Sequence, residues 1–186
     1  QGRCTEDCSF CSQSARYHTG IEEFPLIDSN NILDAATYAE QTDSDSIGIV
    51  TSGQGISSSR DLMSLCTAIE KIAKNTHVHP HGSFGILTRE TAESLVKSGL
   101  KRLNHNLETS ERFFPNVCST HTFMDRINTI RCAREVGLEI CSGAIFGIGE
   151  GIDDRIDLAF TLKMLDVDVV PLNFLHPISG TPLENH

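Results

Sequence analysis

Residues 46–53 read SIGIVTSG, a short run of small and branched apolar side chains that ends in threonine, serine and glycine. An apolar run of this length, bounded by turn residues, predicts a buried β-strand. A stripe of apolar side chains at helical spacing follows it: Leu62, Leu65, Cys66, Ile69 and Ile72. A strand followed by such a helix is typical of a βαβ unit, in which helices join the strands of a parallel sheet.

The same alternation continues along the chain. Further candidate strands are HVHPHGSF (77–84), KRLNHNLE (101–108), EICSGAIFG (139–147) and VDVVPLNFL (167–175). Helical stripes separate them, and Thr88 and the pair Thr122 and Asp125 predict helix N-caps. The sequence therefore predicts one α/β domain over residues 1–186, either a doubly wound sheet or part of a (β/α)₈ barrel.

Polar side chains collect where the predicted strands end. Residues 51–53, 104–108 and 173–177 each carry hydroxyl, amide or carboxyl groups after an apolar run. In barrels and open α/β sheets alike, the chemistry lies at the carboxyl ends of the strands. We expect the functional site at that edge.

Composition narrows the class of function. The chain has 186 residues, 39% of them hydrophobic, and a formal net charge of −10. That balance lacks the basic footprint that nucleic-acid binding needs, so the expected partner is a small molecule. No apolar run approaches the roughly 20 residues that span a bilayer, so we expect no membrane partner and a cytoplasmic protein.

Three of the seven cysteines lie within CTEDCSFC, residues 4–11, and the others are scattered at positions 66, 118, 132 and 141. A secreted disulfide framework would space its cysteines differently. Gaps of three and two residues between cysteines indicate metal ligands in a reducing compartment. The scattered cysteines at 66, 118 and 132 have no motif around them and are interpreted as packing residues.

Two kinds of metal centre fit three cysteines. A structural zinc ion needs four closed ligands, so His18 or Cys66 would have to complete the site. A cubane iron–sulfur cluster takes one thiolate per iron, so three cysteines would leave one iron open to a small molecule. In that case the missing ligand is itself the functional site.

The CxxxCxxC spacing, with Phe10 just before the last cysteine, resembles that of radical S-adenosylmethionine (SAM) enzymes. The longer stretch CTEDCSFCSQSARYHTG is similar to biotin synthases, as are NHNLETS (104–110), CSGAIFGIGE (141–150) and VPLNFLHPISGTPLE (170–184). The resemblance implies a TIM-type (β/α)₈ barrel. It also implies that this chain is a fragment of the radical SAM core, lacking the first strand and the last strands.

The activity implied by this resemblance is that of a sulfurtransferase, which inserts sulfur into dethiobiotin to form biotin through a 5′-deoxyadenosyl radical. The implied cofactors are a 4Fe–4S cluster, SAM and an auxiliary 2Fe–2S cluster. The implied partners are an electron donor such as flavodoxin or ferredoxin and a second copy of the chain in a homodimer. Two alternatives stay open: a related radical SAM enzyme for another small molecule, with an altered or absent auxiliary cluster, and a non-catalytic metal-binding module.

The resemblance also assigns roles near the cluster. It implies that Cys4, Cys8 and Cys11, called here the motif cysteines, ligate the 4Fe–4S cluster and that Phe10 lies beside the adenine of SAM. The remaining implied SAM contacts are Asn106, Glu108, Arg126, Gly143 and Ile145.

Substrate contacts are implied for Asn106 and Asn173. Asn104, Asn106 and Glu108 share one face of the predicted strand, because strand side chains alternate. Without the family, the alternatives are a solvent-facing loop for NHNLE and a solvated helix face for Arg126.

The auxiliary cluster matches the family only in part. Cys141 fits one of three expected strand cysteines, but Gly48 and His81 stand where the other two are expected. In HVHPHGS, His77, His79 and His81 alternate, and imidazole can replace thiolate on iron. One hypothesis is an altered centre held by Cys141 and His81, with His79 as a further candidate ligand. The alternatives are a polar stripe hydrogen-bonded to its neighbours and a register in which the histidines face the helices.

Overall fold

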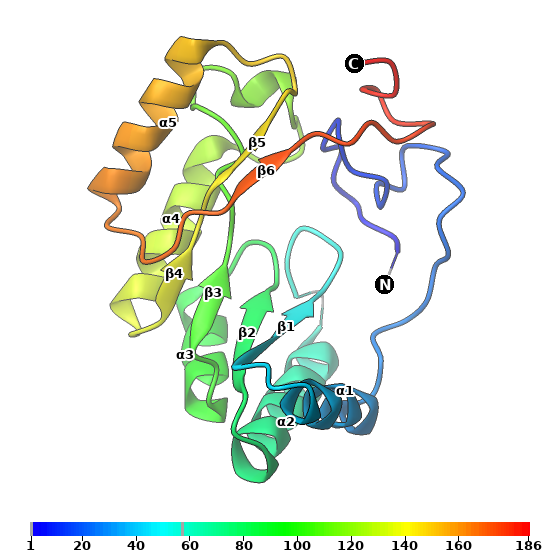
Figure 1. Ribbon diagram of the computed structural model, residues 1–186, viewed down its shortest axis with the longest axis vertical. Helices are drawn as coiled ribbons and strands as arrows, with labels where there is room; N and C mark the ends of the chain where they lie inside the picture. Colours follow the sequence, from blue (N-terminus) through cyan, green and yellow to red (C-terminus); the bar gives the residue numbers. More distant parts are fainter. Residues whose placement is uncertain (1, 57) are drawn as a thin grey trace.

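A computed structural model describes residues 2–56 and 58–186 (Figure 1). Its helices are α1 (Ser29–Gln41), α2 (Ser59–Asn75), α3 (Arg89–Ser98), the short 3₁₀ helix η1 (Phe114–Asn116), α4 (Phe123–Glu135) and α5 (Ile152–Met164). Its strands are β1 (Ser46–Val50), β2 (His79–Ser83), β3 (Arg102–Asn104), β4 (Glu139–Cys141), β5 (Ala144–Phe146) and β6 (Leu172–Phe174). The predicted alternation of strands and helices is confirmed.

Local sequence signals fix several helix ends. The Ser58 and Thr88 side chains accept hydrogen bonds from the first turns of α2 and α3. Thr122 and Asp125 form the predicted capping box of α4, in which each side chain bonds the other's backbone N–H. Gly99 ends α3 in the left-handed conformation, with φ 107°, which glycine adopts without steric cost.

Strand order distinguishes the two folds that the sequence left open. Strands β1, β2, β3 and β4 lie side by side in chain order and all pairs are parallel. β5 and β6 form a second parallel pair, joined to the first sheet through a bridge between Glu108 and Ala144. A doubly wound sheet would reverse its strand order at a switch point, so the sequential order is that of a partial (β/α)₈ barrel.

The sheet has two different faces. Gly82, Leu103 and Ile140 occupy equivalent positions on neighbouring strands and are buried against the helices. Because strand side chains alternate, the residues before and after them on each strand belong to the opposite face of the sheet. The N-terminal and C-terminal segments lie on that side (Figure 1). Arg102 and Asn104 on that face are only half-buried. The interior face of the partial barrel is therefore the polar one.

Residues 2–28 precede the first helix and run along this polar side, where they meet the end of the chain (Figure 1). A Cβ on Gly180 would lie 2.3 Å from the backbone oxygen of His18, so only glycine fits at that approach. In the parts of the chain that the structure describes, no helix has the length and apolar character needed to cross a membrane.

All five predicted strands are shorter than the sequence indicated, and the one expected over 167–175 is only Leu172–Phe174. The strand expected over 101–108 ends at Asn104. Glu108, at the expected strand end, adopts a φ of +72°, which is not a strand conformation. The strand expected over 139–147 is divided into β4 and β5. The break lies at Gly143, where a Cβ would come 1.9 Å from the backbone oxygen of Pro171.

Candidate functional site

A cavity of about 250 Å³ lies at the carboxyl ends of β1, β2 and β3, below the N-terminal segment. Of the residues singled out from the sequence, those that line it are Cys4, Cys8, Phe10, Cys11, Asn106, Glu108 and Arg126. Those that do not line it are His81, Cys141, Gly143, Ile145 and Asn173. The structure therefore brings together the expected cluster ligands and most of the expected SAM contacts.

Backbone hydrogen bonds hold the cysteine loop in place. The Cys4 N–H donates to the Gln13 oxygen over 2.7 Å, and the Cys11 N–H donates to the Cys8 oxygen over 3.0 Å. The Gly53 N–H, just beyond β1, donates to Cys4 Sγ over 3.2 Å. A backbone donor aimed at sulfur favours the thiolate that a metal requires, and such bonds are one of the factors that tune iron–sulfur clusters.

The arrangement of ligand atoms fits a cluster better than a single zinc ion. With Zn–S bonds of about 2.3 Å, the ligands of zinc lie within about 4 Å of one another. Across residues 2–56 and 58–186, the one metal-ligating set whose atoms all lie within 4.8 Å is Glu6, Cys118 and His121, which contains none of the motif cysteines. A cubane takes one thiolate per iron, so its ligands surround a larger group.

Cys8 has a second sulfur beside it. Its hydrogen bond with Cys118, together with burial, raises the pKa of the Cys8 thiol above its ordinary value. Burial likewise raises the pKa of Cys11. Such thiols stay protonated at neutral pH until a metal deprotonates them, so a metal centre bound at this loop would displace protons.

The opposite wall of the cavity is built by the segment after β3. Asn106 Oδ1 accepts a hydrogen bond of 3.1 Å from the Gly143 N–H. The Glu108 N–H donates to the Gly143 oxygen over 3.0 Å, and the Glu108 oxygen accepts from Ile145 over 3.0 Å. These bonds hold Glu108 at its positive φ, and such strained non-glycine residues cluster at functional sites.

Glu108 and Arg126 face each other across 3.8 Å, with only 13% and 12% of their side chains exposed. Burial raises the pKa of Glu108, and Arg126 and Asn106 offset part of that rise. Arg126 lies on α4 but is not the solvated residue that its helix alone would indicate. Its Nη1 donates to the Asn106 oxygen over 2.6 Å, and its guanidinium lies 5.5 Å from the centroid of the Phe114 ring.

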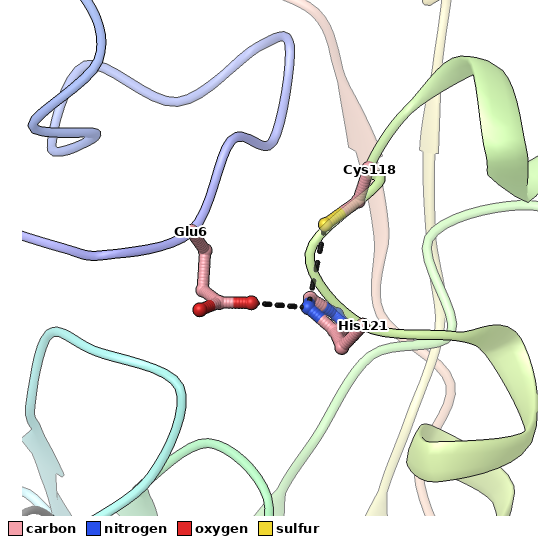
Figure 2. Close-up of side chains that lie close together, drawn as sticks. All are labelled: Glu6, Cys118 and His121. Atoms are coloured by element: carbon pink, nitrogen blue, oxygen red, sulfur yellow. Dashed lines mark hydrogen bonds and ion pairs between the residues drawn. The ribbon is translucent and has the colours of Figure 1, made fainter.

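Residues 118–121 form a part of the site that the sequence analysis missed (Figure 2). Asp7 accepts hydrogen bonds from the Ser119 N–H over 2.8 Å and from the Ser119 hydroxyl. Glu6 Oε2 accepts from the Thr120 hydroxyl over 2.6 Å and lies 2.6 Å from His121 Nδ1. The two acidic residues between the motif cysteines therefore join the cysteine loop to the start of α4.

Cys118 is buried, as a packing residue would be, but its surroundings are polar. Its Sγ lies 3.3 Å from Asp7 Oδ1, from the Thr120 hydroxyl and from His121 Nδ1. The interpretation of Cys118 as a purely apolar core residue is therefore incomplete. Two sequence signals could have indicated this cluster: the cysteine and histidine just ahead of the α4 capping box, and the two acidic residues between the motif cysteines.

Local packing and hydrogen bonds account for the residue types in the glycine-rich segment after β4. Gly143 is required by the close approach of Pro171 described above. The Glu150 carboxylate accepts from the Gly147 N–H over 3.0 Å and is paired with Arg155 at 2.7 Å. These contacts stabilise the turn before α5. Asn173 on β6 pairs with Ile145 and donates to the Ala144 oxygen over 3.3 Å.

The proposed ligands of an auxiliary centre lie on the polar face of the sheet, outside the cavity. His81 pairs with Arg102 on β3, whereas Cys141 on β4 pairs with Asn104. Arg102 forms an ion pair of 2.7 Å with Glu139, between the two strands that carry the candidates. Burial and then Arg102 lower the pKa of His81, and burial raises that of Cys141.

Comparisons with known sequences identify relatives. A model of the radical SAM superfamily matches residues 1–162. The biotin synthase of Geotalea daltonii is 48% identical over 184 residues, which is 99% of this chain and 56% of that protein. The biotin synthase of Thermotoga petrophila is 47% identical over 99% of this chain and 61% of its own length. The chain therefore spans somewhat more than half the length of these relatives.

Solved structures confirm the fold. Methylornithine synthase superposes with a TM-score of 0.88 at 20% identity, over 100% of this chain and 54% of that one. HydG, a maturase of the FeFe-hydrogenase, gives 0.78 at 12% identity over 97% of this chain and 44% of its own. At these identities the likeness establishes the partial barrel alone.

Proposed function

Because this chain belongs to the radical SAM superfamily, we propose that it is the SAM-cleaving part of a biotin synthase, a sulfurtransferase that converts dethiobiotin to biotin. The observation that carries the proposal is the convergence of the motif cysteines with Phe10, Asn106, Glu108 and Arg126 on one cavity. The identity of nearly half of the residues with biotin synthases, over almost the whole chain, supports the same activity. Residues 1–186 form its radical SAM core domain.

The superfamily implies a 4Fe–4S cluster and SAM, and the side chains that line the cavity offer thiol ligands for the first and polar and aromatic contacts for the second. Cys4, Cys8 and Cys11 are the ligands of the cluster. When bound, the cluster supplies the electron that splits the sulfonium of SAM, a reaction for which no side chain is suited. The protein contributes the binding site: a loop fixed by its own backbone bonds, and a Gly53 N–H that donates to Cys4 Sγ.

The residues opposite the cluster bind and orient SAM. Phe10 offers an apolar ring to the adenine, and Asn106 and Glu108 offer polar groups to the ribose. Arg126 binds the carboxylate, for which a buried guanidinium is well suited. Gly143 and Ile145 contribute indirectly. Their backbone hydrogen bonds to Asn106 and Glu108 hold these two residues at the cavity.

The substrate is a small molecule, which we propose to be dethiobiotin. Asn106 on the cavity wall and Asn173 on β6 offer amide groups that can exchange hydrogen bonds with its ureido ring. Asn173 shares a strand pair with Ile145, so it lies on the barrel beside the SAM contacts and not among them. This placement supports a substrate that binds next to the SAM site, farther around the barrel.

For the sulfur source we propose an auxiliary cluster, a 2Fe–2S centre in biotin synthases, with Cys141 as one ligand and His81 as another. Both residues belong to the polar interior face, and Gly48 pairs directly with His81. A neutral imidazole is the form that binds iron, and the lowered pKa of His81 favours it.

The remaining partners follow from this activity. A one-electron donor, such as flavodoxin or ferredoxin, reduces the cluster, and the enzyme acts as a homodimer. Seven cysteines without a disulfide, three of them at a redox centre, favour a reducing compartment, so we place the protein in the cytoplasm.

Anaerobic assay of the reconstituted parent protein tests the proposal. With reductant, SAM and dethiobiotin, we expect 5′-deoxyadenosine, methionine and biotin. Formation of 5′-deoxyadenosine without biotin would contradict biotin synthase and favour a radical SAM enzyme with another substrate. Absence of SAM cleavage would contradict the radical SAM assignment itself and leave a metal-binding module.

A further inference from the structure

The Arg126 guanidinium is held by hydrogen bonds from two of its three nitrogens. Its Nε donates to His121 Nε2 over 3.0 Å, and its Nη1 donates to the Asn106 oxygen over 2.6 Å. Within residues 2–56 and 58–186, Nη2 has no hydrogen-bond partner, and the residue lines the cavity. The contacts therefore fix the side chain and leave one group of donors for a ligand.

The hydrogen bond from Arg126 also determines which nitrogen of His121 carries the proton. Guanidinium can only donate, so Nε2 accepts and Nδ1 bears the hydrogen. Nδ1 then donates to Glu6 Oε2, 2.6 Å away (Figure 2). The imidazole is fixed further by an edge-on contact with Phe114, whose ring centroid lies 5.6 Å away. Arg126, His121 and Glu6 thus form a chain of two hydrogen bonds with fixed donors and acceptors, called here the relay.

The relay is not itself a metal site. Glu6 Oε2 and His121 Nδ1 are 2.6 Å apart, which is a hydrogen-bond distance. Two ligands at about 2.0–2.2 Å from one ion in tetrahedral geometry would be separated by more than 3 Å. The hydrogen on Nδ1 also occupies the lone pair that an ion would need.

We propose that Glu6 and His121 are positioning residues for Arg126 and thereby set the affinity for the amino-acid end of SAM. The inference rests on the proposed function, which assigns Arg126 to the SAM carboxylate. A guanidinium already fixed in place loses little side-chain freedom when the ligand binds, so less of the binding free energy is lost.

The origin of Glu6 gives the relay a second consequence. Glu6 lies between Cys4 and Cys8, so one short segment carries both the cluster ligands and the first residue of the relay. Any shift of this loop moves Glu6 and, through His121, the guanidinium. The relay therefore holds the cysteine loop and the Arg126 guanidinium, which bind the two ends of SAM, at a fixed position relative to each other.

The test uses the iron-reconstituted protein and two stable analogues. S-adenosylhomocysteine carries the carboxylate, whereas methylthioadenosine lacks the whole amino-acid end. Equilibrium dialysis gives a dissociation constant for each without turnover. His121→Asn keeps an amide donor near the Nδ1 position but loses the acceptor for Arg126, and His121→Gln places an amide oxygen near Nε2. The exposed His77→Asn is the matched control.

We expect His121→Asn to weaken S-adenosylhomocysteine binding about tenfold, as for the loss of one hydrogen bond to a charged group. Methylthioadenosine should bind as in the wild type, and His121→Gln should recover most of the lost affinity. Glu6→Gln, which keeps an acceptor, should weaken S-adenosylhomocysteine about threefold. It provides the same contrast if His121→Asn fails to take up iron.

Equal losses for the two analogues would overturn the inference, because His121 would then only shape the cavity. Unchanged binding of S-adenosylhomocysteine in His121→Asn and Glu6→Gln would also overturn it. A wild-type protein that binds neither analogue would contradict the proposed function, and with it this inference.

Discussion

The cavity of the motif cysteines and the polar face that carries His81 and Cys141 differ in how the chain supports them. Around the cavity, the cysteine loop, the end of β1, the segment after β3 and the start of α4 are joined by hydrogen bonds. On the polar face of β1 to β4, the one side-chain pair that interacts among the residues the structure describes is Arg102–Glu139. The protein's own hydrogen bonds thus fix the side chains around the cavity before any ligand binds. On the polar face, a bound group would have to fix them.

Removing a motif cysteine is the strongest test of this difference. In Cys8→Ala we expect loss of the 4Fe–4S cluster and a fall in SAM cleavage beyond the 10- to 100-fold range typical of losing an outer-shell partner of a metal. Iron content and 5′-deoxyadenosine yield measure both effects. Cys66→Ala, on α2 and outside the cavity, is the matched control and should keep both. Iron retention in Cys8→Ala would contradict the ligand assignment.

Cys141→Ala should separate the two regions. We expect SAM cleavage within about twofold of the wild type and biotin formation lower by at least about 100-fold, because only the auxiliary centre loses a ligand. The two products are quantified in one anaerobic reaction. Parallel loss of SAM cleavage would show that the regions are not independent.

His81→Asn should have a smaller effect in the same direction. If His81 ligates the auxiliary iron, the second iron signal in Mössbauer spectra should change and biotin formation should fall about tenfold, with SAM cleavage retained. His79→Asn, two residues earlier on the exposed part of β2, is the control. An unaltered second signal in His81→Asn would favour the polar-stripe interpretation.

The smallest effect concerns the tie between the cysteine loop and residues 118–121. Burial alone would raise the pKa of Asp7, but hydrogen bonds from Ser119, Cys118 and Thr120 together hold it below its ordinary value of 3.8. Its contribution to stability is therefore present above about pH 5 and is lost as the pH falls below the unfolded value. Asp7→Asn should lower the free energy of unfolding of the cluster-free chain by about 1–2 kcal/mol near neutral pH.

Denaturant titrations between neutral pH and pH 3 check this sign. The difference between wild type and Asp7→Asn should shrink as the pH falls. The exposed Asp34→Asn on α1 serves as the matched control. A difference that grows on acidification would contradict the role assigned to Asp7.

Much of the fold could be predicted because its signals are local. Thr88, Thr122 and Asp125 mark helix starts within a few residues of the bonds they make. Whether the sheet was doubly wound or a barrel depended on strand order, which no local pattern encodes. The positive φ of Glu108 was missed because it is held by bonds to Gly143 and Ile145, far along the chain.

Residues of the site could likewise be predicted where their signal is local in the sequence. Cys4, Cys8 and Cys11 were found from their spacing alone, and Arg126 only through the family resemblance. The relay from Glu6 to His121 was missed because its members are 115 residues apart in sequence. Glu6 and Asp7, between the motif cysteines, were a signal for contacts to another segment, because a loop that only holds iron does not need acidic side chains.

In the proposed function, three cysteines hold a cluster whose open iron binds SAM. Mössbauer spectroscopy tests this on the protein reconstituted anaerobically with isotopically enriched iron, recorded with and without SAM. We expect a cubane signature in which one iron changes its spectrum when SAM is added, as a single open site requires. A site filled by zinc, or a cluster spectrum that SAM leaves unchanged, would contradict it.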